Sequence, residues 1–484
     1  MKLFLVGLLI LLSGYLLYGV IVKKILKPDD RETPALAKRD GVDYLELPHW
    51  KNMLIQLLNI AGIGPVIGVI SGILFGDIVF VIIPVGCVLM GAVHDYVAGM
   101  MSMRHGGANL TELVRLTAGK HLYRVFSVFL VIALLLVVAV FINVPARLLA
   151  GMIGGNSAFL WSVVGIFVYY ICATMFPVDK IIGKIYPVFG AVLLIGTAAL
   201  LVTLLFNAFK DPSLLMESEA FRSKMFTAAG HKPVLPLLFV TIACGIISGF
   251  HATQAPIVAR TIKNEKQGFN VFFGMMIVEG FIAMVWAAGA LAIYNKFPAL
   301  IGTNPNGVLA TITNTFLKSN LSSVVVVSVI ILAITSGDTA MRSLRLSLAE
   351  IFHIDQRPVL PRLGVVLPLI LLTAGLLIWS NFNSDSFQKL WTYFAWSNQV
   401  IAVFALLAGS IYLFSIGRPA FITVIPGMFI TFVVVTYIFW ISPEHGGPVG
   451  LGLDLHHAYL FAGFIAVMLF AWAKIRGDEV KMNK

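Results

Sequence analysis

Thirteen apolar segments separated by short polar stretches constrain this chain more than any other feature of its sequence. Most hold about 20 residues, enough to cross a hydrocarbon layer about 30 Å thick at 1.5 Å per residue. Hydrophobic residues make up 59% of the chain and charged residues 12%. Soluble domains are only about half apolar and about a quarter charged. The chain is therefore predicted to be an all-α polytopic membrane protein, which excludes a soluble enzyme, a nucleic-acid-binding protein and a disordered chain. The predicted segments are 3–22, 52–74, 77–101, 122–144, 158–176, 181–206, 234–257, 269–294, 321–341, 363–381, 389–415, 419–441 and 456–475.

Basic residues are distributed unequally between the two sides of the predicted membrane. With the N-terminus outside, 25 of the 34 Lys and Arg residues fall on the cytoplasmic side and 9 fall outside. Cytoplasmic loops of membrane proteins carry such an excess. The bias predicts an external N-terminus and a cytoplasmic C-terminus, and it explains the net charge of +11 by topology and contact with anionic lipid. The first segment is interpreted as an uncleaved anchor, because its basic cluster follows the apolar run.

Two segments are interrupted by helix-weakening residues at what should be mid-membrane depth. Glycine and proline both destabilise a helix interior, and non-helical backbone in a membrane is tolerated where it lines a cavity or is buried in protein. Close packing of helices through small residues is the alternative for either segment alone. The residues singled out as a substrate site are Gly62, Gly64, Pro65 and Gly68 in the first interruption, and Gly245, Ser248, Gly249, His251, Thr253 and Gln254 in the second.

Each interrupted segment opens a series of five apolar segments, and five is odd, so the second series must enter the membrane with the opposite orientation. Paired interrupted helices in inverted repeats indicate a secondary transporter with its site at the repeat interface. The predicted division is 1–51, an anchor helix and cytoplasmic loop; 52–206, the first repeat; 207–233, an external loop; 234–415, the inverted second repeat; and 416–484, two C-terminal helices and a cytoplasmic tail.

Ionisable residues inside membrane segments are costly and indicate functional sites. Glu279 is placed deepest, about 15 Å into its segment at helical rise, and is either a proton carrier or a structural hydrogen bonder. His251 and Asp95 are the other candidates for proton coupling. His251 fits equally a histidine satisfied by a carbonyl, and His94-Asp95 fits equally a solvated vestibule.

Uncharged polar residues suggest further contacts. Thr335 and Ser336 offer hydroxyl oxygens that suit a small cation, although bonding back to their own helix is the commoner alternative. Asn398 and Gln399 line a pathway or form an interhelical hydrogen bond. No Walker-type loop, H-E-x-x-H motif or nucleophile elbow occurs in the sequence. Neither enzymatic activity nor a cofactor is therefore expected.

Five motifs occur together in a family-specific order. They are Ile60-Ala-Gly-Ile-Gly-Pro65, Gly91-Ala-Val-His-Asp95, Cys244-Gly-Ile-Ile-Ser-Gly-Phe-His251, Val278-Glu279-Gly-Phe281 and the Trp-x-x-Phe-x-x-x-Asn-Gln stretch from Trp391 to Gln399. Over about residues 52–415 the chain resembles the carbon starvation protein A (CstA) family of bacterial inner-membrane transporters. It is shorter than the commonest members, and its Ala-Thr-Gln-Ala-Pro sequence after His251 departs from the longer form.

The resemblance implies a LeuT-type fold with two five-helix inverted repeats. It also implies import of peptides, or of pyruvate with protons. In such a fold the third span of the second repeat packs against the first broken helix and both hold a coupling cation. Here that predicts a candidate sodium site formed by Thr335, Ser336 and carbonyls near Gly62. The resemblance leaves open whether the coupling ion is H⁺ or Na⁺.

The functional prediction is a symporter that imports a peptide or a pyruvate-like monocarboxylate by alternating access. The interrupted segments form the site, because exposed half-helix N-termini favour a carboxylate. Glu279, with His251 nearby, carries or gates a proton. The alternative is a starvation-linked membrane sensor or scaffold that binds the same ligand without net transport. The expected partners are the small-molecule substrate and the lipid bilayer, with no nucleic acid, and no oligomeric state is predicted.

The charge count predicts cytoplasmic loops after residues 101, 257 and 341 and external loops after 206 and 294. Lys224→Cys should react with a membrane-impermeant thiol reagent in intact cells, whereas Lys263→Cys should react only after the membrane is opened. The reverse pattern would overturn the orientation.

Overall fold

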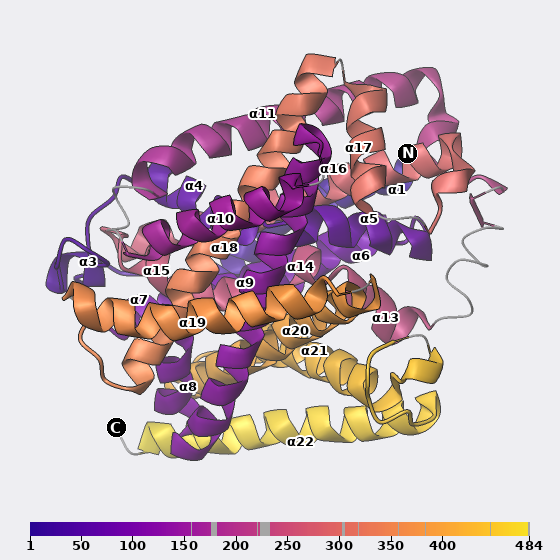
Figure 1. Ribbon diagram of the computed structural model, residues 1–484. Helices are drawn as coiled ribbons and strands as arrows, with labels where there is room; N and C mark the ends of the chain where they lie inside the picture. Colours follow the sequence, from indigo (N-terminus) through magenta and orange to yellow (C-terminus); the bar gives the residue numbers. More distant parts are fainter. Residues whose placement is uncertain are drawn as a thin grey trace.

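The computed structural model describes residues 1–155, 157–175, 182–219, 221–222, 233–302, 305–317, 319–356, 358–382, 384–445 and 447–482. Within these ranges every regular element is helical (Figure 1). Eleven helices in the described part of the chain are long and apolar enough to cross a membrane. The long spans confirm the predicted helical membrane class. Lys224, the external labelling position, lies outside the described residues.

The spans lie where the segments were predicted. The long ones are α1–α2 (Lys2–Leu26), α6–α7 (Val79–Arg104), α9 (Lys120–Ile153), α10 (Ala158–Met175), α11 (Ile182–Lys210), α16 (Met275–Lys296), α18 (Ser319–Ile351), α19 (Val359–Ser380), α20 (Ser384–Ser415), α21 (Phe421–Trp440) and α22 (Leu455–Met482). Of these, α9, α18 and α22 continue seven to ten residues beyond the predicted ends. Shorter helices include α3 (Pro34–Ala37), α8 (Leu110–Ala118) and α17 (Pro305–Phe316).

Both predicted interruptions are breaks in the helical backbone. In the first, α4 (His49–Ile60) ends and the helix resumes at Gly64–Phe75 with its axis turned by 54°. The second predicted span is divided into α13 (Val234–Thr241), α14 (Ala243–Ile246) and α15 (Gly249–Ala259). Between α14 and α15 the backbone is extended at Ile247 and Ser248. The thirteen predicted segments therefore correspond to eleven long helices and these two broken ones.

The two breaks pack against one another at positions without side chains. A Cβ atom on Gly64 would overlap Cβ of Cys244, and one on Gly68 would lie 2.8 Å from the carbonyl oxygen of Thr241. Gly249 lies against α20, where a Cβ atom would overlap the backbone of Asn398. The break glycines thus also provide the close helix packing that was the alternative interpretation.

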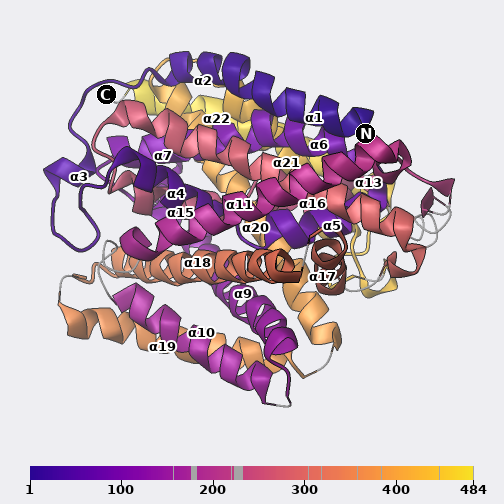
Figure 2. The same ribbon diagram turned by 90° about the horizontal axis from the view of Figure 1, so that it is seen from above.

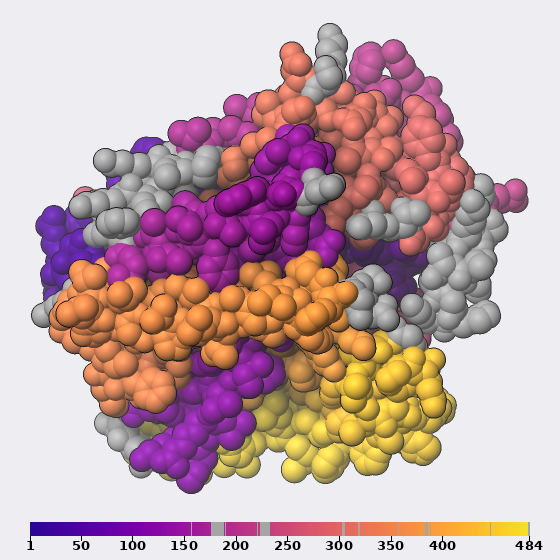
Figure 3. Space-filling view, viewed as in Figure 1, coloured from indigo at the N-terminus to yellow at the C-terminus, as the bar shows by residue number. Residues whose placement is uncertain are grey.

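Four helices pack together as one layer of the bundle. α9 packs against α10, α18 and α19, and α10 also contacts α18 and α19. Figure 2 shows this group below the rest of the bundle, and Figure 3 shows α10 and α19 side by side on one face. We call α9, α10, α18 and α19 the four-helix layer. The broken helix α4 contacts both α18 of this layer and α16 opposite it.

The loops that follow α2, α7, α15 and α18 meet at one end of the bundle. Lys38 donates to the carbonyl of Gly106 at 2.9 Å, and Arg260 donates to that of Gly107 at 2.9 Å. We call this the α3 end, and it lies at the left in Figure 1. The loops that the charge count assigns to one side of the membrane therefore lie together.

Replacement of Gly249 tests the close contact between α15 and α20. Gly249→Ala should lower the free energy of unfolding by about 1–3 kcal/mol, because the new Cβ meets backbone atoms that cannot rotate away. The matched control is Gly165→Ala on α10, where no heavy atom lies within 4 Å of the added Cβ. Thermal unfolding of the detergent-purified variants measures both. Equal unfolding temperatures would contradict the packing.

Candidate functional site

Four ionisable side chains form a buried acid–histidine cluster between α7, α15 and α16. Oδ1 of Asp95 lies 2.8 Å from Nδ1 of His94, and Oδ2 lies 3.1 Å from Nδ1 of His251. Nε2 of His251 lies 3.7 Å from Oε2 of Glu279. The structure thus brings together the three residues proposed for proton coupling, in the order Asp95, His251, Glu279. His94 adds a fourth member at the Asp95 end.

The cluster is closed to solvent, since none of its four residues is more than 1% exposed. Within the described part of the chain, both carboxyl oxygens of Glu279 and Nε2 of each histidine have no hydrogen-bond partner. An uncompensated charge at such a site costs several kcal/mol. The charge of the cluster must therefore be balanced among its own four side chains.

Irregular backbone positions each member of the cluster. α7 (Ala92–Arg104) follows a π-helical turn at Cys87–Gly91, and α16 follows another at Phe269–Gly274. Such turns are rare in proteins, and many of those that occur lie at functional sites. His251 lies in the first turn of α15, directly after the extended break. Gly91 allows α7 to approach this break, because a Cβ atom there would lie 2.5 Å from the carbonyl oxygen of Ile246.

Asn398 fixes the geometry of the second break. Its Oδ1 accepts from the backbone N–H of Phe250 at 2.6 Å, and its Nδ2 donates to Oγ of Ser248 at 2.6 Å. Gln399 donates from Nε2 to the carbonyl of Phe239 at 2.8 Å. Of the two interpretations given for this pair, the structure shows the interhelical hydrogen bonds.

The remaining polar residues predicted in the second break bond locally. Thr253 donates from Oγ1 to the carbonyl of Phe250 at 2.7 Å, and Gln254 donates from Nε2 to Oγ1 of Thr253 at 3.1 Å. Oε1 of Gln254 has no partner among the described residues. Gly245 faces the first broken helix, with its added Cβ 3.2 Å from Val69. Pro65 opens the half-helix at its second position, where a missing N–H is tolerated. Contact of these residues with substrate stays a prediction.

The third span of the second series, α18, packs against α4 as expected. Oγ of Ser336 donates to the carbonyl of Leu58 at 3.1 Å, and a Cβ atom on Gly62 would lie 3.1 Å from the same Oγ. Thr335 also donates to Leu332 in its own helix at 3.0 Å, the commoner alternative. Both predicted hydroxyl ligands therefore lie within 3.5 Å of one carbonyl at the first break, that of Leu58, and ion binding there stays a prediction.

Sequence reasoning missed an aromatic group beside this point. The ring of Phe141 on α9 lies 5.7 Å from that of Phe250 and 5.8 Å from that of Phe394, and a Cβ atom on Gly62 would lie 3.0 Å from it. It also missed Gln56 and Asn59 on α4, whose buried amide groups have no partner among the described residues. The amides could have been found as polar interruptions of an apolar segment; the phenylalanines carry no such signal.

Two broken helices in contact, with a long span packed against the first, are the arrangement of secondary membrane transporters with a LeuT-type fold. A manganese transporter from Eremococcus coleocola, solved with an aromatic bis-isothiourea compound, has a TM-score of 0.58 at 14% identity and covers 91% of this chain and 99% of its own. A Na⁺-coupled sialic acid symporter has a TM-score of 0.51 at 14% identity, with 97% of both chains covered. The model of the carbon starvation protein CstA family matches residues 1–164, 152–324 and 303–437, and the chain belongs to this family.

Relatives with assigned roles support the same class. The peptide transporter CstA of Bacillus subtilis (strain 168) is 25% identical, with 97% of this chain and 96% of that protein covered. The pyruvate/proton symporter BtsT of Escherichia coli (strain K12) is 26% identical, with 63% of this chain and 50% of that protein covered. A membrane protein of Haemophilus influenzae is 41% identical, with 60% and 91% covered.

Proposed function

We propose that this protein is a proton-coupled symporter that imports a peptide or a pyruvate-like monocarboxylate across the bacterial inner membrane. The carrying observation is the buried series His94–Asp95–His251–Glu279. Carboxyl and imidazole groups can bind and release protons, which is the chemistry that a proton-coupled transporter requires. The relatives that are named a peptide transporter and a pyruvate/proton symporter support this choice.

The cluster connects proton binding to the broken helix. His251 belongs to α15, whereas Asp95 and Glu279 belong to the continuous helices α7 and α16. A movement of α15 would therefore change the distances from His251 to both acids. A proton taken up at Glu279 removes a buried charge and favours one position of α15, and its release favours the other. Substrate binding at the breaks would act on the same helix.

The substrate's carboxylate is proposed to bind where the two half-helices begin. Gly64 and Cys244 are in contact, so the N-terminal turn at Gly64 lies close to the second break. N-terminal turns favour negative charge. Gly62, Gly64, Ser248 and Thr253 are the proposed contacts, and Asn398 holds the second break in place for them.

We assign the α3 end to the cytoplasm, because the loops that meet there carry the basic excess. The amino group of Met1 lies at the opposite end, where it donates to the carbonyl of Leu215. This assignment gives an external N-terminus and a cytoplasmic C-terminus. The sensor alternative is not favoured, since the relatives with assigned roles are transporters.

Glu279→Gln tests the proton carrier, because glutamine mimics the neutral carboxyl at nearly constant volume. Accumulation of labelled substrate driven by a proton gradient should fall by about tenfold or more. A tenfold fall corresponds to a loss of about 1.4 kcal/mol of the free energy that drives accumulation. Exchange of substrate across the membrane should persist, since it needs no net proton movement. Proteoliposome uptake of pyruvate and of a dipeptide, measured side by side, distinguishes the substrates.

The control is Glu112→Gln, which removes a partly exposed acid on the short helix α8 that pairs with Arg115 and does not belong to the cluster. It should leave accumulation unchanged. Normal pH dependence in Glu279→Gln would eliminate Glu279 as carrier and move the role to His251 or Asp95. Binding without accumulation by the unaltered protein would support the sensor.

If protons are the coupling ion, the rate of substrate uptake should not depend on the sodium concentration. Replacing Na⁺ by choline should leave the rate unchanged. Thr335→Ala and Ser336→Ala should then lose about 1 kcal/mol of stability each, from the missing hydrogen bonds, while transport continues. Sodium-stimulated uptake that disappears in both variants would instead assign a sodium site to these hydroxyl groups.

A further inference from the structure

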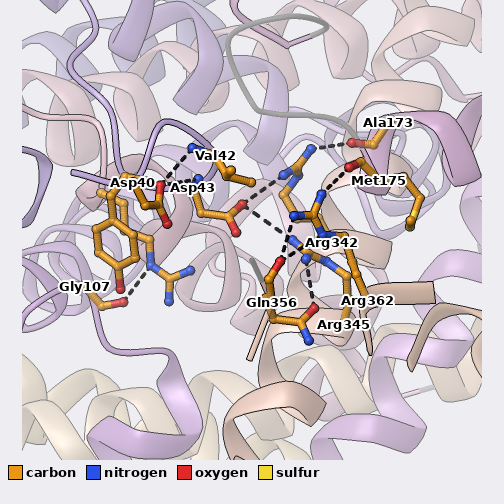
Figure 4. A network of polar contacts seen from close by, with 12 residues as sticks. Asp40, Val42, Asp43, Gly107, Ala173, Met175, Arg342, Arg345, Gln356 and Arg362 are labelled. Atoms are coloured by element: carbon orange, nitrogen blue, oxygen red, sulfur yellow. Dashed lines mark hydrogen bonds and ion pairs between the residues drawn. The ribbon is translucent and has the colours of Figure 1, made fainter. Parts of the chain in front are cut away.

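A second buried ionic network lies at the α3 end, outside the acid–histidine cluster (Figure 4). Oδ1 of Asp43, in the segment between α3 and α4, lies 3.0 Å from Nη1 of Arg342 and 3.5 Å from Nη2 of Arg345. Asp43 is 7% exposed, Arg342 1% and Arg345 0%. Figure 4 shows the carboxyl group of Asp43 pointing toward the guanidinium groups of α18. The arrangement is a two-arginine pocket holding one carboxylate.

The two arginines require an anion at this position. They are three residues apart on α18 and therefore lie on the same face, where two buried positive charges repel one another. Burial raises the pKa of Asp43, but Arg345, Arg342 and Arg260 lower it more, so the pKa lies below its usual value. Asp43 is thus ionised at neutral pH. Nε of Arg345 has no partner among the described residues, which leaves a buried donor for a further oxygen.

Asp43 is supplied by a segment attached to a different helix. The backbone N–H of Leu45 donates to the carbonyl of Arg260 at 3.3 Å, and that of Leu47 donates to the carbonyl of Thr261 at 3.1 Å. Both acceptors directly follow α15. The carboxyl group of Asp40 accepts from the backbone N–H groups of Val42, Asp43 and Tyr44 and so fixes the turn. Asp43 is therefore held on a rigid turn that would move with the end of α15 and with α4.

The ion pairs of Asp43 join this segment to the four-helix layer, because Arg342 and Arg345 belong to α18. A second buried ion pair at the same end involves no residue of the four-helix layer. Arg104 on α7 donates to Glu265, the first residue of the span that contains α16, at 2.8 Å and to the carbonyl of Leu26 at 2.8 Å. Opening of the α3 end between α15 and α18 would thus separate Asp43 from its arginines and leave Arg104 with Glu265.

Arg342 also lies on the same face of α18 as Thr335, which is beside the predicted substrate site. Arg342 follows Thr335 by seven residues, so both lie on one face of α18, about 10 Å apart at helical rise. Thr335 lies beside the first break, 3.5 Å from the carbonyl of Leu58. Nearby α4 carries the unpartnered amides of Gln56 and Asn59. One face of α18 therefore leads from the break to the arginine pair.

We propose that Arg342 and Arg345 form a carboxylate-binding site on the cytoplasmic exit route, which Asp43 occupies in the closed state and yields to the substrate's carboxylate as the α3 end opens. This inference rests on the proposed function, since peptides and pyruvate both carry a carboxylate. Exchange of one carboxylate for another keeps an anion beside the two guanidinium groups throughout. Return of Asp43 would expel the substrate and close the route. Guanidinium groups suit this exchange because they bind carboxylates through paired hydrogen bonds.

Asp43→Asn removes the carboxylate that occupies the two-arginine site and leaves a neutral side chain of nearly the same volume. Sodium acetate, compared with sodium chloride and with neutral acetamide, should raise the thermal unfolding temperature of the detergent-purified variant. The half-maximal acetate concentration should be about tenfold lower than for the unaltered protein, in which Asp43 competes. Asp43→Asn with Arg345→Gln should lose the effect. Glu46→Gln, which removes a more exposed acid from the same segment, should behave like the unaltered protein.

Equal acetate responses in Asp43→Asn and the unaltered protein would overturn the site, as would an acetate response that survives Arg345→Gln. If Asp43→Asn does not fold, Arg345→Gln alone is tested in proteoliposomes. Its KM for substrate on the cytoplasmic side should rise about tenfold while the external KM stays unchanged. Equal KM values on the two sides would overturn the proposal. Acetate binding needs no transport, so failure of uptake with a normal acetate response would refute the proposed function and leave the site standing.

Discussion

The satisfaction of backbone polar groups inside the membrane is the constraint on which the rest of this structure depends. A broken helix exposes N–H and C=O groups that lipid cannot bond, so each break must be buried in protein. The two breaks meet that requirement together: Gly64 contacts Cys244, and the N–H of Phe250 is bonded by Asn398. The same packing brings the first break against α18. Burial of the breaks therefore assembles the predicted substrate site.

Burial imposes a second constraint on the ionisable groups. Two carboxyl groups and two imidazoles without access to water must balance their charge among themselves. In the proposed mechanism, the protonation of Glu279 depends on the position of His251, and hence on α15. On that proposal, a cluster that would only cost stability in a static protein couples proton binding to movement, because one of its members lies on a broken helix.

α15 connects the two ionic sites of the molecule. His251 lies in its first turn, and Arg260 follows its last residue, with its guanidinium group 5.1 Å from the ring centre of Tyr44. The Asp43 turn is attached at that point. Nine residues, about 14 Å of helix, thus separate His251 of the acid–histidine cluster from Arg260, where the Asp43 turn is attached. A rigid helix of this length would transmit a shift at one site to the other.

The sequence by itself determined the features that depend on local composition. Apolar runs predicted the spans, because crossing the membrane requires only length and hydropathy, and Gly62–Gly68 and Gly245–Gly249 predicted the breaks, because glycine and proline weaken any helix. Asp95, His251 and Glu279 stood out because charge in an apolar run is costly.

Only the tertiary structure decided that these three meet, that Asn398 bonds the second break and that Asp43 faces Arg342. Asp43 and Arg342 are 299 residues apart, and no local pattern records such a pairing. Their contact follows from how the helices pack, which sets the distances that give each charge its partner.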